Sequence, residues 1–158
     1  MQEKKKALYA GSFDPFTNGH LDIAKEASEL FDEVYICVAH NPNKKRTTNE
    51  YDMVDAIRAT LKENGINNAY VLVIDGLVAD FCMKNNIEYL VRGLRNTSDY
   101  MYEENIAKIN AEVNPNLKTV YFRAKNDVIS SSMVRELYNY GKDVTAYLPK
   151  EILKFYYA

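Results

Sequence analysis

The sequence predicts one α/β domain, residues 1–158, in which a Rossmann-like, mostly parallel sheet of five strands is flanked by helices. Two observations carry this prediction. Five short runs are rich in β-branched and aromatic residues and are almost continuously apolar, as is typical of parallel strands buried on both faces. Amphipathic segments separate these runs, so strands and helices alternate along the chain. No internal repeat, low-complexity tract or long linker divides the sequence.

The elements follow one another in a regular order. The expected strands are 7–10, 33–40, 69–75, 88–93 and 118–124, and the expected helices are 19–32, 49–64, 77–85, 98–112, 130–140 and a terminal helix that begins near Pro149. In the first helix, Ile23, Ala27 and Leu30 recur at helical spacing and are expected to face the sheet. Gly65 is placed to end the second helix.

Composition excludes several classes of protein. Lys and Arg number 20 against 22 Asp and Glu, so the net charge of −2 gives no general affinity for nucleic acid, and an anion site has to be local. No apolar run approaches the ~18 residues of a membrane span, and the N-terminus lacks the apolar core of a signal peptide. We therefore expect a cytoplasmic protein.

Cys37 and Cys82 have no metal-ligand spacing and are expected to be buried free thiols in a reducing compartment, with no structural metal.

The connection between the first strand and the first helix, "YAGSFDPFTNGH" (9–20), is crowded with polar and turn-forming residues. It matches neither G-x-G-x-x-G nor G-x-x-x-x-G-K-[ST], which argues against dinucleotide oxidoreductases and P-loop proteins. Gly11 allows a ligand to approach the backbone, and Ser12 and Thr17 supply hydroxyls. His20 falls in the first helical turn, where the helix field attracts anions and disfavours imidazolium. We expect a neutral, N–H-donating His20; a histidine that only caps or packs is the alternative.

Cations follow two other strands. "HNPNKKR" (40–46) places three of them after the second strand, where a solvated charge run is the alternative to a phosphate contact. After the fourth strand, Arg92 and Arg95 flank Gly93. A guanidinium at the end of a buried strand is costly unless it is paired, so Arg92 is expected to have an anionic partner.

The last predicted helix begins with "VISSSMVRE", in which three serines precede Arg135. An N-cap serine is ordinary, but three hydroxyls and a guanidinium favour an anion cradle. The sequence shows no Ser–His–Asp or Cys–His arrangement and no cluster of metal-ligating carboxylates. This inventory favours phosphoryl or nucleotidyl transfer, in which positioning and charge neutralisation do most of the catalysis.

Two motifs resemble those of the nucleotidyltransferase superfamily. Thr17-Asn18-Gly19-His20 resembles the (T/H)xGH signature, and "ISSSMVR" (129–135) resembles the ISSTxxR-like signature. "VRGLR" (91–95), "DYMYEE" (99–104) and the ending "GKDVTAYLP" (141–149) narrow the resemblance to the bacterial phosphopantetheine adenylyltransferases. It extends over essentially the whole chain.

The resemblance implies transfer of an adenylyl group from ATP to 4'-phosphopantetheine, with dephospho-coenzyme A and pyrophosphate as products. This is the penultimate step of coenzyme A biosynthesis. The resemblance also implies Mg²⁺ as cofactor, bound through ATP phosphates rather than protein side chains, a homohexamer, and no nucleic-acid or membrane partner.

Carried over by position, the resemblance implies catalytic roles for His20, as a transition-state stabiliser, and for Lys44 and Arg92. Residues implied in ATP binding are Ser12, Phe13, His20, Gly93, Leu94, Arg95, Glu103, Asn126, Asp127, Val128, Ile129, Ser130, Ser131 and Ser132. Residues implied in phosphopantetheine binding are Ser12, Lys44, Leu77, Val78, Arg92, Tyr102 and Asn110. The chain departs from the family pattern in having Ser12 where Thr is common, Val78 where Leu or Met is common, and a short "AKNDVISSS" loop without an aromatic before the serines.

Two other readings remain open. A sister nucleotidyltransferase, acting on nicotinamide mononucleotide or using CTP with a polyol phosphate, would share the histidine and serine motifs; "VRGLR" and the apolar Leu77–Val78 pair argue against it. A non-catalytic nucleotide-binding protein on the same fold would be expected to lack His20 or a key cation, and neither is missing.

Overall fold

Five parallel strands form one sheet in the computed structural model, which describes residues 3–158. The strands are β1 (Lys6–Gly11), β2 (Glu33–His40), β3 (Ala69–Asp75), β4 (Tyr89–Leu94) and β5 (Lys118–Arg123). They lie in the order β3–β2–β1–β4–β5, and every neighbouring pair is parallel. The predicted fold class is confirmed, and the sheet is wholly rather than mostly parallel.

A helix connects each strand to the next, and a fifth helix follows β5. The helices are α1 (Asn18–Leu30), α2 (Glu50–Glu63), α3 (Val78–Lys84), α4 (Thr97–Val113) and α5 (Ser131–Asn139). Four of them begin at a polar N-cap whose side chain accepts a backbone N–H, namely Thr17, Asn49, Asn96 and Ser130. Gly65 follows α2 with a φ of +70°, a left-handed conformation that glycine adopts without steric cost.

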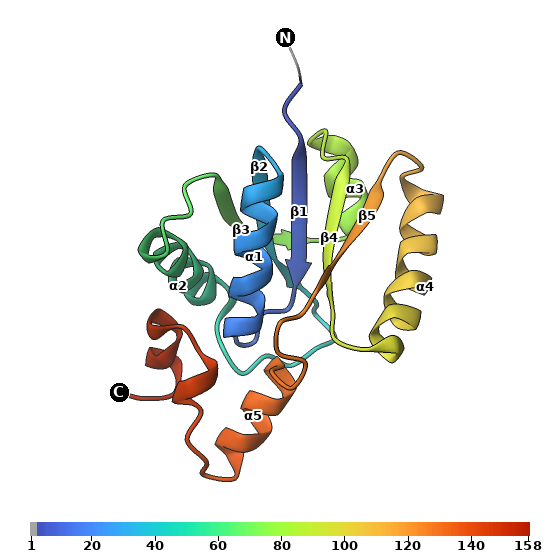
Figure 1. The fold of residues 1–158 in the computed structure, drawn as a ribbon. Helices are drawn as coiled ribbons and strands as arrows, with labels where there is room; N and C mark the ends of the chain where they lie inside the picture. The colour runs from blue at the N-terminus through green and yellow to red at the C-terminus, as the bar shows by residue number, and fades with distance from the viewer. Residues whose placement is uncertain (1–2) are drawn as a thin grey trace.

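The two faces of the sheet are covered by different helices. Buried side chains of α1, α2, α5 and the C-terminal segment form the larger core, and α1 crosses in front of the sheet in Figure 1. Helix α3 and the end of α4 pack in the smaller core on the other face. The chain therefore changes face between β1 and β4, which are neighbours in the sheet.

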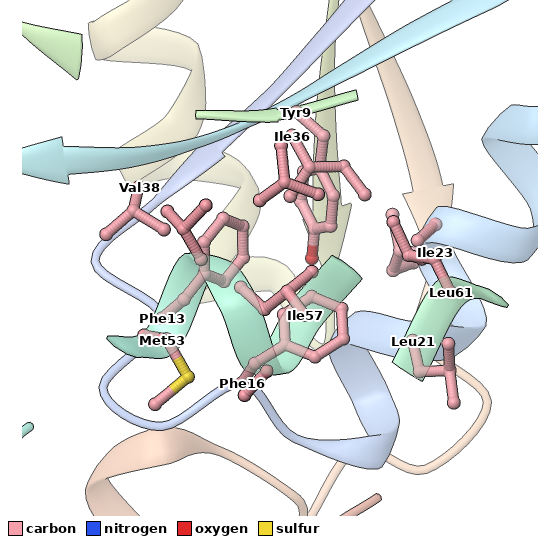
Figure 2. Packing of buried hydrophobic residues seen from close by; sticks show 14 of the residues in the cluster. Tyr9, Phe13, Phe16, Leu21, Ile23, Ile36, Val38, Met53, Ile57 and Leu61 are labelled. Atoms are coloured by element: carbon pink, nitrogen blue, oxygen red, sulfur yellow. The ribbon is translucent and has the colours of Figure 1, made fainter. Parts of the chain in front are cut away.

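Aromatic rings from the β1–α1 loop anchor that loop in the larger core. Figure 2 shows Phe13 and Phe16 gathered beside Tyr9 of β1 and Ile57 of α2. The ring centroids of Phe13 lie 5.2 Å from Tyr9 and 5.3 Å from Phe16, both in edge-on geometry, which suits the quadrupoles of aromatic rings. The loop that carries the predicted site is thus fixed by packing.

The smaller core contains both cysteines. Cys37 on β2 and Cys82 on α3 are buried and free, as the sequence predicts. Burial disfavours the thiolate, which raises the pKa of Cys37 and raises the pKa of Cys82 to about 12. Neither thiol is poised to act as a nucleophile.

Two details differ from the sequence prediction. Leu30, expected to face the sheet, is 60% exposed because it is the last residue of α1, and Phe31 takes the buried place beside Tyr89 with ring centroids 5.2 Å apart. The terminal helix is a pair of 3₁₀ segments, η1 (Thr145–Tyr147) and η2 (Lys150–Phe155), in which Ile152 is buried. Hydrogen bonds spaced by three residues, such as Ile152 N–H to the Pro149 carbonyl, suit a short segment whose packing outweighs the α-helical pattern.

No helix within residues 3–158 has the length and apolar character needed to cross a bilayer.

Candidate active site

A cavity of about 300 Å³ lies at the carboxyl ends of β1 and β4. This is the point where the chain changes face, and open parallel sheets bind ligands at such a point. In Figure 1 it corresponds to the lower edge of the sheet, toward which β1 points. The lining residues are Tyr9, Ala10, Gly11, Ser12, Phe13, Thr17, Gly19, His20, Ile23, Arg92, Gly93, Arg95, Asp99, Tyr102, Glu103, Ala124, Asn126, Ile129, Ser130 and Ser131.

His20 is held by the cap of its own helix. It stands three residues after the N-cap Thr17, and its backbone N–H donates to the Thr17 hydroxyl at 3.4 Å. In return, the Thr17 backbone N–H donates to Nδ1 of His20 at 2.9 Å. Such reciprocal bonds form a capping box, here with an imidazole in the place usually taken by Glu or Gln. The histidine therefore both caps the helix and lines the cavity, so the two alternatives posed by the sequence coexist.

The surroundings of His20 favour its neutral form. Burial, followed by the charges of Arg95 and Arg92, lowers the pKa of His20 to about 3. Because Nδ1 accepts an N–H, the proton of the neutral ring resides on Nε2. Phe13 and Phe16 hold the ring from two sides, with centroids 4.9 and 5.5 Å away. The site thus presents one fixed, uncharged N–H donor.

Arg92 forms a bidentate ion pair with Glu103, and both residues line the cavity. Its Nε and Nη2 donate to the two carboxylate oxygens at 2.6 and 2.8 Å, and Nη1 donates to the Ala10 carbonyl at 3.0 Å. Burial works against the charge, yet the Glu103 carboxylate keeps the pKa of Arg92 above its usual value. The anionic partner predicted for Arg92 is therefore a residue of α4, and a bound phosphate would share or replace it.

Arg95 is the more accessible guanidinium. It pairs with Asp99 four residues later, with 3.0 Å between Nε and Oδ2, and its side chain is 38% exposed. Exposed pairs of this kind are weak, so Arg95 can exchange its carboxylate for a ligand anion at little cost. Arg92 and Arg95 thus bring two guanidinium groups to this wall of the cavity, and each is balanced by a carboxylate that also lines it, Glu103 and Asp99.

The carboxylate of Asp14 joins the β1–α1 loop to the β2–α2 loop. It accepts four hydrogen bonds of 2.6–2.9 Å, from the backbone N–H and the hydroxyl of both Thr47 and Thr48. Although burial opposes the charge, these bonds from Thr48 and Thr47 hold the pKa of Asp14 below its usual value. The ionised carboxylate fixes the two loops against each other.

The serine loop, residues 130–132 at the start of α5, is bonded to the β1–α1 loop. The Ser131 hydroxyl donates to the Pro15 carbonyl at 2.7 Å, and Arg135 donates to the Asp14 carbonyl at 2.6 Å. Ser130 is the N-cap, accepting from Met133 N–H at 3.1 Å, and Ser132 accepts from Arg135 at 3.2 Å. The hydroxyls and Arg135 therefore hold α5 in place, while Ser130 and Ser131 also line the cavity.

Gly93 allows α1 to approach the sheet at the cavity. A Cβ built on Gly93 would lie 3.3 Å from Cγ1 and 3.4 Å from Cδ1 of Ile23, which is closer than most real contacts. The glycine between the two arginines is thus explained by packing against α1.

Comparison with known proteins gives a consistent family. The cytidylyltransferase-like family model matches residues 8–137. A phosphopantetheine adenylyltransferase of Vesicomyosocius okutanii is 40% identical over 151 residues, covering 94% of both chains. One from Heliobacterium modesticaldum is 40% identical over 149 residues, covering 93% of this chain and 88% of the relative.

The chain belongs to the phosphopantetheine adenylyltransferase family.

Solved structures with little sequence similarity share the fold of this family. A nicotinic acid mononucleotide adenylyltransferase of Plasmodium falciparum, complexed with NaAD, superposes with a TM-score of 0.72 at 15% identity, covering 97% of this chain and 94% of that one. A bifunctional NMN adenylyltransferase/ADP ribose pyrophosphatase from Francisella tularensis gives 0.70 at 18%, covering 96% of this chain and 47% of that one. At these identities the likeness concerns the fold alone.

Most of the residues assigned through the family resemblance lie together. Those that line the cavity are Ser12, Phe13, His20, Arg92, Gly93, Arg95, Tyr102, Glu103, Asn126, Ile129, Ser130 and Ser131. Those outside its lining are Lys44, Leu77, Val78, Leu94, Asn110, Asp127, Val128 and Ser132. Lys44 is exposed on the β2–α2 loop, and Leu77 and Val78 begin α3, so both groups lie on segments that follow neighbouring strands. Their roles remain predictions.

Sequence reasoning did not assign several lining residues. Tyr9 and Ile23 look like ordinary core residues in the sequence, and Asp99 looks like a solvated helix residue. Arg46 was visible only as one of three cations, but its guanidinium binds loop carbonyls instead of remaining in solvent. The four-bond role of Asp14 also left no signal beyond a turn-forming Asp-Pro pair.

Proposed function

We propose that this chain transfers an adenylyl group from ATP to 4'-phosphopantetheine, forming dephospho-coenzyme A and pyrophosphate by direct in-line attack. The observation that carries the proposal is the cavity where the chain changes face between β1 and β4: its lining includes His20, with one neutral N–H donor, and the guanidinium groups of Arg92 and Arg95. Family membership supplies the substrate class. No covalent enzyme intermediate is invoked.

The reaction depends more on stabilising the negative charge of the phosphates than on a general base. A phosphate monoester is already ionised near neutral pH, because its second pKa is about 6. A histidine with its pKa near 3 is a poor base, and its Nδ1 is already occupied. Its Nε2–H instead stabilises the charge that develops on the α-phosphate, together with the N-terminus of α1.

In this proposal, each cationic side chain binds a particular phosphate group of one of the two substrates. Lys44 and Arg92 orient the attacking phosphate of phosphopantetheine, whereas Arg95 and the serine loop hold the departing β- and γ-phosphates. Arg92 lies at the ends of β1 and β4, bonded to Ala10, and so is placed near the centre of the edge. Lys44 is on an exposed loop docked through Asp14, and would reach the same phosphate from the β2 side.

The remaining assigned residues fall to two sides. Leu77, Val78, Tyr102 and Asn110 would contact the pantetheine arm, and Tyr102 contributes to the cavity wall. Gly93, Leu94, Glu103 and the segment 126–132 would contact the nucleotide. The apolar start of α3, with Leu77 59% exposed, is suited to an extended organic arm.

Mg²⁺ is proposed to enter with the triphosphate. Within residues 3–158 no group of three His, Cys, Asp or Glu side chains is placed to hold a metal ion, and Glu103 and Asp99 are committed to arginines. These residues fit an ion carried by phosphate oxygens, which would add positive charge beside His20 and Arg95. A homohexameric assembly and a cytoplasmic location complete the proposal, on the strength of the family resemblance.

A sister nucleotidyltransferase activity is the second candidate, because the solved structures named above act on pyridine mononucleotides and share the fold. Pyrophosphate release from ATP and Mg²⁺ should be measured with 4'-phosphopantetheine, nicotinamide mononucleotide and glycerol phosphate in parallel, and with CTP replacing ATP. We expect release only with ATP and phosphopantetheine. Release with one of the other acceptors alone would replace the proposal, and saturable ATP binding without turnover of any acceptor would indicate a non-catalytic protein.

A further inference from the structure

Arg46 makes an unusual set of contacts for a residue in a loop with three cations. Its side chain is 13% exposed. Nη1 donates to the Ser12 carbonyl, Nη2 to the Phe13 carbonyl at 3.3 Å, and Nε to the Thr48 carbonyl at 3.0 Å. Arg46 does not line the cavity, but Ser12 and Phe13 do.

These contacts fix the direction of a peptide that faces the site. The Ser12–Phe13 peptide is trans, and in a trans peptide the C=O and the N–H point in opposite directions. With the Ser12 carbonyl turned to Arg46, the Phe13 N–H points away from it. No partner for the Phe13 N–H occurs among residues 3–158. The contacts of Arg46 thus leave the Phe13 N–H as a free donor on a segment that lines the cavity.

The backbone at Phe13 also needs outside support. Its φ is +46°, in the left-handed region that a bulky L-residue enters only at a cost. The Phe13 ring is buried, with its centroid 4.9 Å from the imidazole of His20. Releasing the Phe13 carbonyl from Arg46 would therefore disturb both the free N–H and the packing of His20.

The same guanidinium links this peptide to the neighbouring loop. Arg46 bonds Thr48, whose hydroxyl and N–H bond Asp14, and Lys44 lies two residues before Arg46. Three separate carbonyls are reached from one planar fork, a geometry that the single ammonium of lysine cannot reproduce.

We propose that Arg46 is a positioning residue: it turns the Ser12–Phe13 peptide so that the Phe13 N–H becomes a donor for an anionic ligand oxygen. Arg46 also docks the β2–α2 loop, which carries Lys44, beside that donor. The effect of Arg46 on turnover rests on the proposed function, whereas its effect on the peptide does not. Arg46 itself touches no substrate.

The test compares Arg46→Lys and Arg46→Met with Arg58→Lys and Arg58→Met. Arg58 is a matched control because it also donates to a backbone carbonyl, that of Val71 at 2.8 Å, but on α2 away from the cavity. We expect both Arg46 variants to lower kcat at least about tenfold, since displaced donors act mainly in the transition state, while KM for phosphopantetheine changes less than about threefold. The Arg58 variants should keep kcat.

A second readout does not need activity. In ¹⁵N-labelled protein, the Phe13 amide should shift on addition of a non-hydrolysable ATP analogue in the wild type and in Arg58→Lys, and should shift less in Arg46→Lys. If no acceptor is turned over by the wild type but this pattern holds, the proposed function fails and the positioning role stands. If Arg46→Met does not fold, Arg46→Lys decides. Wild-type kcat in a folded Arg46 variant, or an unaltered Phe13 response, would overturn the inference.

Discussion

The backbone N–H of Thr17 donates to Nδ1 of His20 at 2.9 Å, and this single bond decides which nitrogen of the imidazole is left to act. Nδ1 is an acceptor inside the capping box, so Nε2 carries the proton of the neutral ring. The geometry that caps α1 therefore also fixes the tautomer and the orientation of the catalytic candidate.

Removal of His20 should impair turnover more than binding. We expect His20→Ala to fold and to lose about 10²–10³ in kcat, the usual effect of removing one preorganised donor. His20→Gln, whose amide can donate from a similar place, should retain more activity. His40→Gln serves as the control, because His40 is bonded to Glu50 and does not line the cavity. Steady-state kinetics with both substrates gives the answer, and a His20→Ala enzyme with normal kcat would refute the role.

The pKa values of the two histidines should be shifted in opposite directions. Burial lowers the pKa of His20 to about 3, whereas the hydrogen bond to Glu50 raises the pKa of His40 above 6.5. NMR titration of the imidazole resonances measures both, and the chain has only these two histidines, so His40→Gln assigns them. A His20 that protonates near pH 6.5 would contradict the neutral state assigned to this residue.

Stability should fall on mild acidification because of His20. Its folded pKa lies below its unfolded value of 6.5, so between pH about 3 and 6.5 the unfolded chain binds more protons and the folded state loses stability as the pH falls. The loss approaches about 1.4 kcal/mol per pH unit below 6.5. Urea denaturation at pH 7.5 and 5.5 should show about 1 kcal/mol more loss for the wild type than for His20→Gln. An equal loss in the two proteins would exclude this linkage.

The Arg92–Glu103 pair should be strongly coupled. Glu103→Gln leaves a mostly buried guanidinium without its anion, and loss of one partner of a buried pair costs about 3–5 kcal/mol. Arg92→Met strands the carboxylate in the same way, so the double variant should cost less than the two single changes together. A double-mutant cycle of unfolding free energies should give a coupling of about 1–3 kcal/mol. Additive effects would mean that the pair is absent in solution.

Gly93→Ala tests the close approach of α1. The added methyl would meet Ile23 at 3.3 Å, and overpacking of this kind costs about 1–3 kcal/mol. Ile23→Val removes the Cδ1 atom, which would lie 3.4 Å from the new methyl, but keeps Cγ1 at 3.3 Å, so it should restore part of the stability and of the ATP affinity lost by Gly93→Ala. The thermal midpoint and calorimetric ATP titration report the two effects. If the second change brings no recovery, the glycine is required for another reason.

The fold was predictable because its signals are local and repeated. Continuous apolar runs and helical spacing identify strands and helices without knowledge of partners, and the carboxyl-end rule for parallel sheets locates the site. The errors lie where packing outweighs local pattern. Leu30 has the spacing of a buried residue but ends its helix, and the segment after Pro149 becomes 3₁₀ as Ile152 packs in the core.

The sequence predicts many of the residues that line the candidate cavity, but not the bonds between them. His20, Arg92 and the serines are recognisable from residue type and place. Nothing in the sequence shows that Arg92 pairs with Glu103, 11 positions away, or that Asp14 receives four bonds from residues more than 30 positions later. Such partners depend on how loops fold against each other, and this is also why Arg46 could not be told apart from its two neighbouring lysines.

The burial of Cys37 and Cys82 has a practical consequence. Because both sulfur atoms are shielded and their thiolates are disfavoured, the native protein offers no reactive thiol to a maleimide reagent. A cysteine introduced at an exposed position, such as Lys142, would then be the single site of labelling. A fluorophore or spin label placed there would report on the segment that follows α5 without any cysteine being removed first.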